Sequence, residues 1–278
     1  MSATTPPNPS APKLSARALH AGYPGRRVIE NLDLEIAPGR LTMIIGANAC
    51  GKSTLLGVLA RLNSPLAGEV HLDGVDVSRI TRRRFAQTVG LLPQHPIAPD
   101  GLTVAELVSR GRHPHRGVFS RWSSADTAQV DEAMRLTGVA ALGDRPVGDL
   151  SGGQRQRVWI AMALAQNPEI LLLDEPTTFL DLSHQLEVLD LLVHLNREHG
   201  TTIVVVLHEL NLAARYADDL VVMHEGRIVA QGAPGDVLTA EVLSEAFALD
   251  ALVMPDPLTG TPLVVPRPGG AHLPPDAL

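Results

Sequence analysis

Hydrophobic and polar residues alternate near the start of the chain and give way further on to runs that are wholly apolar. The alternation over 14–19 and over 28–36 predicts two β-strands, joined through the turn Tyr23-Pro24-Gly25. Runs that are apolar apart from a threonine at 42 and at 202 predict buried strands at 41–45, 170–173 and 202–207, and the wholly apolar 170–173 is typical of the middle of a parallel sheet. Shorter strand patterns cover 68–74, 89–92, 220–224 and 228–230.

The segments between these strands show helical periodicity. Apolar residues at helical spacing between 96 and 146 predict an inserted helical subdomain, which together with the start of the next helix spans about 96–163. Longer helices are predicted from Ser151 to Asn167 and over 183–199. Strands that alternate with helices indicate an α/β fold. The expected division is a disordered leader at 1–13, one domain at 14–254, and a Pro- and Gly-rich tail at 255–278.

Composition narrows the class of protein. Of the 278 residues, 45% are hydrophobic, which suffices for a buried core. The longest apolar run, Val158–Ala165, is too short to cross a bilayer, and no signal-peptide pattern opens the chain. A single cysteine excludes a disulfide framework, so we expect a soluble cytoplasmic protein. A formal net charge of −7 and only 3% aromatic residues argue against a nucleic-acid partner.

The strongest chemical signal follows the apolar run 41–45. Gly46 to Ser53 reads G-A-N-A-C-G-K-S, which matches the phosphate-loop spacing G-x-x-x-x-G-K-[ST]. Glycines let such a loop turn its N–H groups toward phosphate oxygens, and the following helix directs its positive end there. Lys52 would place its charge on the β- and γ-phosphates, and the Ser53 hydroxyl would bind Mg²⁺. The predicted nucleotide-binding residues are Gly46, Ala47, Asn48, Ala49, Cys50, Gly51, Lys52, Ser53 and Thr54.

Two carboxylates end the apolar run 170–173. Asp174 and Glu175 stand at the carboxyl end of a predicted central strand, where open α/β sheets bind their ligands. Asp174 would hold Mg²⁺ through water, and Glu175 would accept a proton from the attacking water. The alternative interpretation, a cap for the following turn, is less favoured because the phosphate loop stands in the same chain.

Several polar residues leave two interpretations open. Tyr23 either stacks on a base or is an ordinary turn residue. Gln94 either completes a metal shell or belongs to a plain loop, and His208 is either structural or reaches the γ-phosphate. The pair His113 and His115 lies in an arginine-rich stretch without a nearby cysteine, which favours an exposed contact loop over half of a metal site.

The start of the helix predicted from Ser151 has an unusual composition. Ser151 is a suitable N-cap, and Gly152 and Gly153 give a backbone that another molecule can approach closely before Gln154. An exposed helix N-terminus of this kind predicts a second anion site. The alternative is a flexible cap.

In combination these motifs resemble the nucleotide-binding subunit of ABC transporters. The resemblance extends from Leu14 to about Pro266, and six marks stand in that family's order, namely the loop at Gly46, Gln94, the signature Leu150–Gln154, Asp174-Glu175, the D-loop Asp181 and the switch histidine His208. It implies a P-loop NTPase with a RecA-like, mainly parallel sheet, an N-terminal antiparallel β subdomain and an inserted helical subdomain. It also implies an adenine-stacking Tyr23 and a Gln94 that senses Mg²⁺ and the permease.

The resemblance further implies an ATPase that uses ATP and Mg²⁺. Its partners would be a second copy of itself or a paralogous subunit in a head-to-tail dimer, transmembrane permease subunits and, indirectly, an extracytoplasmic substrate-binding protein. In that dimer Ser151, Gly152, Gly153, Gln154 and Asp181 would meet the partner's nucleotide. The expected location is the cytoplasmic face of the cell membrane, as a peripheral subunit.

Within the family, the chain is similar to the subgroup that imports ferric siderophores, with haem and cobalamin importers as relatives. The similar stretches are Gly111–His115, Ser151–Gln166, Pro176–Gln185, Val206–Asp218 and Pro255–Pro262. Ala47 stands where the subgroup often has proline and Ala49 where glycine is common, and neither change removes a ligand. The rival of another class, a soluble ABC ATPase acting on DNA or ribosomes, is disfavoured by the single cassette, the missing coiled coil and the acidity.

Overall fold

The computed structural model describes residues 13–117 and 120–268, so residues 1–12 of the expected leader lie outside the described residues. Lys13, which we expected to belong to that leader, is placed in the fold. Its backbone N–H donates to Ile36 O at 2.7 Å, and its ammonium group pairs with Asp73 at 3.0 Å and Glu169 at 2.7 Å. A proline-rich composition does not predict such long-range partners.

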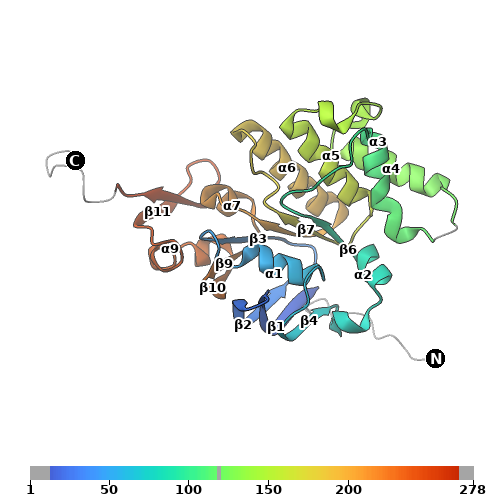
Figure 1. Ribbon diagram of the computed structural model, residues 1–278. Coiled ribbons are helices and arrows are strands. Elements are labelled where there is room, and N and C mark those ends of the chain that lie inside the picture. Colours follow the sequence, from blue (N-terminus) through green and yellow to red (C-terminus); the bar gives the residue numbers. More distant parts are fainter. Residues whose placement is uncertain (1–12, 118–119, 269–278) are drawn as a thin grey trace.

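A parallel-rich sheet forms the centre of the described part of the chain (Figure 1). Its strand order is β10-β9-β3-β8-β7-β6, and the pairings are parallel except for the antiparallel pair β9 and β10. The strands are β3 Leu41–Gly46, β6 Val89–Leu92, β7 Ile170–Asp174, β8 Thr202–Val206, β9 Asp219–His224 and β10 Arg227–Gly232. The strands β3, β7 and β8 are buried on both faces, which confirms the prediction of central strands.

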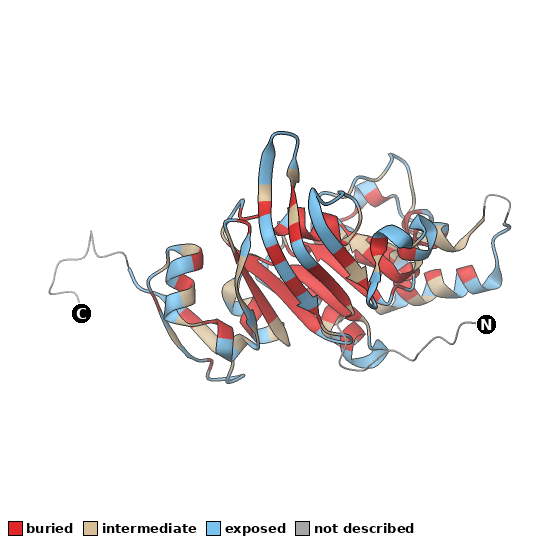
Figure 2. Cartoon of the chain, turned by 90° about the horizontal axis from the view of Figure 1, so that it is seen from below, coloured by how far each residue is buried: buried red, intermediate tan, exposed pale blue. Residues whose placement is uncertain are grey.

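An antiparallel sheet of order β2-β1-β4-β5 lies beside the centre. Its strands are β1 Leu14–Tyr23, β2 Arg26–Ile36, β4 Ala67–Leu72 and β5 Val75–Asp76. Buried and exposed residues alternate along β2, so one face packs inward and the other meets solvent. Figure 2 shows this contrast with the almost wholly buried central strands. The α/β fold with an N-terminal antiparallel sheet is confirmed.

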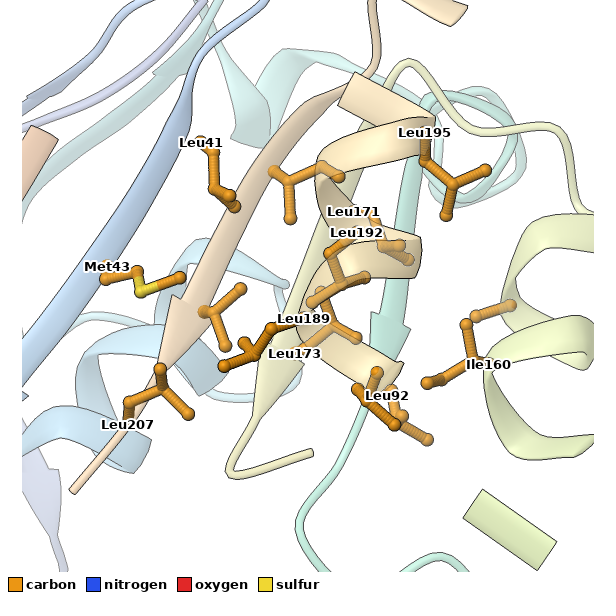
Figure 3. Close-up of a cluster of buried hydrophobic side chains, with 14 of the residues drawn as sticks. Leu41, Met43, Leu92, Ile160, Leu171, Leu173, Leu189, Leu192, Leu195 and Leu207 are labelled. Atoms are coloured by element: carbon orange, nitrogen blue, oxygen red, sulfur yellow. The ribbon is translucent and has the colours of Figure 1, made fainter. Parts of the chain in front are cut away.

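Two hydrophobic cores flank the central sheet, because successive residues of a strand face opposite sides. Leu171 and Leu173 of β7 join the core under α5 and α6, whereas Ile170 and Leu172 join the core shared with α1 and the antiparallel sheet. Figure 3 shows the first core, where leucines of α6 gather over the strands. The helices around the sheet are α1 Lys52–Leu59, α2 Arg82–Thr88, α6 Leu182–His199 and α7 Leu210–Tyr216.

Residues between β6 and β7 form a group of helices. These are α3 Val104–Ser109, η2 Arg110–His115, α4 Ser124–Leu136, η3 Ala140–Leu142, η4 Val147–Asp149 and α5 Gly152–Ala165. The basic stretch was expected to be an exposed contact loop, but Arg112 is buried: its guanidinium pairs with Asp126 at 2.9 Å and donates to Ala165 O at 2.8 Å. His115 Nε2 lies 2.7 Å from Gln166 O. The Asp126 side chain of α4 and backbone carbonyls at the end of α5 therefore hold part of this stretch in place.

The C-terminal part of the described chain is more structured than its composition indicates. It contains the short α8 Pro234–Val237, then α9 Ala240–Phe247, β11 Ala251–Pro255 and β12 Pro262–Pro266, whereas the short η1 Val77–Arg79 follows β5. The Asn211 side chain on α7 bonds both the N–H and the C=O of Val264, and Arg215 pairs with Asp256 at 2.6 Å. The first part of the expected tail is thus docked on α7, while 269–278 lie outside the described residues. None of the helices in the described part has the length and apolar character needed to span a membrane.

Candidate active site

The loop from β3 to α1 has a backbone that side chains would obstruct. A Cβ on Gly46 would lie 2.3 Å from Met223 O, so this glycine lets the loop pass close to β9. Gly51, the residue before α1, has φ +111°, a conformation that glycine adopts readily. Ala49 adopts φ +62°, which costs roughly 1 kcal/mol for a residue with a Cβ. Alanine in place of glycine at position 49 therefore strains the backbone, even though it removes no ligand.

Lys52 lies at the start of α1 and is buried. Its ammonium group donates to Gly46 O at 2.9 Å and to Ala47 O at 3.0 Å, both in the same loop. The charge is thus held at the mouth of the curled loop, beside the N-terminus of a helix. A cation and a helix N-terminus in this arrangement attract an anion such as a phosphate.

The two carboxylates at the end of β7 have different partners. Asp174 Oδ1 accepts a hydrogen bond from the Ser53 hydroxyl at 3.1 Å, so two of the three predicted metal ligands are adjacent. The Glu175 carboxylate accepts bonds from Gln94 Nε2 at 2.6 Å and Thr178 Oγ1 at 3.1 Å, and it pairs with His208 Nε2. Sequence reasoning missed Thr178, which carries no local signal beyond its place three residues after Glu175.

These different surroundings shift the pKa values of the two carboxylates in opposite directions. Burial raises the pKa of Asp174 above its ordinary value, and the hydrogen bond from Ser53, which lowers the pKa, has a smaller effect. Burial acts in the same direction on Glu175, but the bond and charge of His208, with Gln94 and Thr178, outweigh it and lower the pKa of Glu175. Glu175 is therefore ionised at neutral pH and able to accept a proton.

A cavity of about 430 Å³ joins Lys52, Ser53 and Glu175, and its volume is in the range of small-molecule sites. The predicted residues that line it are Tyr23, Asn48, Ala49, Gly51, Lys52, Ser53, Thr54, Gln94, Glu175 and His208. Arg26 and Val28 line it as well and were not predicted. Both lie on β2, two residues apart, so their side chains point to the same face of the strand. This period of two was the signal in the sequence that could have grouped them. Tyr23 stands exposed at the rim.

Comparison with known proteins agrees with this geometry. The family model described as ABC transporter matches residues 29–178, more than half of the chain. The chain belongs to the ABC transporter family. It is 52% identical to the achromobactin transport ATP-binding protein of Dickeya dadantii, over 91% of this chain and 94% of that one. It is 51% identical to the ferric enterobactin transport ATP-binding protein of Escherichia coli, over 92% and 95%.

Solved ABC structures share the fold. One is a metal-chelate type ABC transporter in an inward-facing conformation, with a TM-score of 0.80 and 28% identity over 93% of this chain and 98% of that chain. Another is a dimeric ATP-binding cassette bound to ADP and Pi, with a TM-score of 0.69 and 27% identity over 79% and 98%. The family binds ATP, and this chain is an ABC-type ATPase whose relatives assemble as dimers.

The residues predicted to form the signature lie outside this cavity. Ser151 caps α5 in a capping box with Gln154, Gly152 is exposed and Gly153 is buried. Asp181 caps α6 by accepting from the backbone N–H of His184 at 3.0 Å. The predicted residues that do not line the cavity are Gly46, Ala47, Cys50, Ser151, Gly152, Gly153, Gln154, Asp174 and Asp181. Gly46 and Ala47 support Lys52, and Cys50 is buried in the core against α1.

Proposed function

We propose that this chain is the ATP-hydrolysing subunit of an ABC importer that energises the uptake of ferric siderophores. The observation that carries the proposal is that Lys52 and Glu175 line one cavity: a cation suited to phosphates and an ionised carboxylate suited to accept a proton. Hydrolysis of the terminal phosphate bond needs both groups.

In the proposed reaction ATP lies with its phosphates over the loop 46–53 and its base toward Tyr23, with Val28 and Arg26 beside it. Lys52 would exchange its bonds to loop carbonyls for bonds to phosphate oxygens. Glu175 would orient a water and take its proton as the oxygen attacks the γ-phosphorus and ADP leaves. His208 and Gln94, which already contact Glu175, would hold that carboxylate in place.

The residues present also suit Mg²⁺, which prefers oxygen ligands and keeps several waters. The Ser53 hydroxyl and the Asp174 carboxylate are adjacent at 3.1 Å, and Gln94 lines the same cavity. These three residues would hold the ion together with phosphate oxygens. When bound, Mg²⁺ would neutralise charge that develops on the phosphates.

The signature residues require a partner in this proposal. Ser151, Gly152, Gly153, Gln154 and Asp181 would meet the nucleotide of a second copy, or of a paralogous subunit, in a head-to-tail dimer. The absence of these residues from the cavity of their own chain supports that arrangement. The dimer would act on permease subunits from the cytoplasmic face of the membrane, and an extracytoplasmic binding protein would deliver the substrate. No nucleic acid is involved.

The substrate proposal rests on the order of similarity among relatives. Proteins named for achromobactin and ferric enterobactin transport are 52% and 51% identical to this chain, whereas a hemin import protein of Rhodococcus jostii is 41% identical. A haem or cobalamin importer is the alternative of the same class. Because the transported substrate does not enter the ATP site, the assignment needs a transport measurement.

The test is uptake of radioiron supplied as several classes of ferric siderophore, in iron-limited source cells that carry Glu175→Gln instead of the wild-type chain. We expect uptake of one class to be lost and uptake of unrelated solutes to be unchanged. Glu198→Gln, an exposed residue on α6, is the matched control and should transport normally. Normal uptake of every chelate by the Glu175→Gln cells would contradict the substrate assignment.

A further inference from the structure

The side chain of His184 contacts both the start of α5 and the loop residue that caps α6. Gly153 is buried, and a Cβ on it would lie 2.8 Å from His184 Cδ2 and 3.2 Å from Cγ. The imidazole ring therefore occupies the space that the missing side chain leaves. Gly153 does not adopt a positive φ, so the contact with the ring, and not backbone freedom, is what requires glycine here.

The same ring binds Asp181. His184 Nδ1 lies 2.7 Å from Asp181 Oδ1, which also accepts from the His184 backbone N–H at 3.0 Å and from Ser183 Oγ at 2.9 Å. These bonds, the backbone one first, lower the pKa of Asp181 to about 2. An ionised carboxylate can only accept, so Nδ1 is the donor in this pair.

One turn further along, Arg157 of α5 pairs with Glu187 of α6. These residues lie four positions after Gly153 and three after His184, so they repeat the contact on the same helix faces. Two contacts therefore connect the N-terminal ends of α5 and α6. Only the contact made by His184 involves the signature and Asp181.

We propose that His184 is a positioning residue that holds the signature helix and the Asp181 loop of one chain in register, so that they meet the nucleotide of a second copy as one unit. The inference rests on the composite dimer proposed above, and it assigns to His184 a role in dimer assembly and none in binding nucleotide within its own chain. His184 does not line the nucleotide cavity, which agrees with that division.

Two substitutions separate the two contacts. His184→Phe keeps a ring beside Gly153 but removes the bond to Asp181. His184→Asn loses the ring but places an amide N–H where Nδ1 stands. His194→Asn, an exposed histidine further along the same helix, is the matched control.

Each change is made in the Glu175→Gln chain. Affinity for ADP, by titration calorimetry, reports on the cavity within one chain, and sedimentation with ATP reports on dimer formation. We expect His184→Phe to weaken ATP-driven dimer formation about tenfold or more, as for loss of a hydrogen bond to a charged group, while ADP affinity stays within about twofold. His184→Asn keeps a bond to Asp181 but leaves the space beside Gly153 empty, so it should also weaken dimer formation, and His194→Asn should match the parent.

Three outcomes would overturn the assignment of His184. They are dimer formation by His184→Phe equal to the parent, dimer formation by His184→Asn equal to the parent, and a parallel loss of ADP affinity, which would indicate general damage to the fold. A parent chain that binds ADP but does not dimerise with ATP would instead overturn the composite site of the proposed function, and with it the inference.

Discussion

At the scale of single residues, Glu175 shows how neighbours set the chemistry of a common side chain. Gln94 and Thr178 both donate to one of its oxygens, and His208 pairs with the other. These contacts outweigh the effect of burial and keep the carboxylate ionised. A carboxylate that is already ionised can accept a proton without first losing one.

Lys52 is the residue for which the structure gives the clearest expectation. Lys52→Ala removes the charge at the mouth of the loop, so we expect ATP affinity to fall roughly 100-fold. Titration calorimetry measures the change. Lys13→Ala is the control, because Lys13 is the other lysine of the chain and its ion pairs involve Asp73 and Glu169, away from the cavity. Equal ATP affinity for Lys52→Ala and the wild type would rule out the phosphate contact.

At the scale of elements, the helical region depends on a buried ion pair. Asp126 accepts from the Ser123 hydroxyl at 2.7 Å in the capping box of α4, and from Arg112 Nε of η2 at 2.9 Å. Arg112 also donates a hydrogen bond to Ala165 O in the last turn of α5. One carboxylate thus stabilises a helix start and joins three elements, and for that reason the basic stretch is not a free loop.

Asp126→Asn leaves Arg112 without its buried charge partner, so we expect the free energy of unfolding to fall by about 3 kcal/mol. Denaturant unfolding at neutral pH measures it. The control is Glu132→Gln on the same helix, whose pair with Arg135 is exposed, and no measurable change is expected. Unfolding of Asp126→Asn at the wild-type denaturant concentration would show that the pair contributes no net stability.

The same pair predicts a pH dependence. The bonds from Ser123 and then Arg112 lower the pKa of Asp126 to about 2, below its ordinary value of 3.8. Because the pKa is lowered in the folded state, the contribution of ionised Asp126 to the free energy of unfolding is complete above about pH 4 and is lost as the pH falls toward about 2. Between those values the wild-type chain should lose stability faster than Asp126→Asn. Parallel losses in the two chains would place the acid sensitivity elsewhere.

At the scale of the whole molecule, one chain holds two separate halves of a site. Lys52 and Glu175 face the cavity, whereas Ser151 and Asp181 begin helices outside it. Relatives in this family form dimers, and a head-to-tail pair would bring the halves together. Hydrolysis and dimer dissociation would then be coupled through Glu175.

Glu175→Gln should bind ATP, hydrolyse it at least about 100-fold more slowly, and remain a dimer, because the proton acceptor is lost while the phosphate contacts stay. Light scattering should show twice the mass of one chain with ATP and a single mass with ADP. Combining this change with Lys52→Ala should abolish the dimer. Full turnover by Glu175→Gln would exclude Glu175 as the base.

The sequence by itself determined the parts of this protein that depend on neighbouring positions. Periodicity defined the central strands, and fixed spacing defined the phosphate loop at 46–53 and the carboxylates after β7. These features are local because a loop that surrounds a phosphate, or a strand buried on both faces, is built from consecutive residues.

Only the tertiary structure decided which distant side chains meet. It placed Gln94 on Glu175, 81 residues away, buried Arg112, and brought His184 against Gly153. Each of these contacts joins separate elements, and a pairing across elements depends on how helices and strands pack, which no single stretch of sequence encodes. The residues that bear the chemistry could therefore be read from the chain, while the partners that set their charge and position could not.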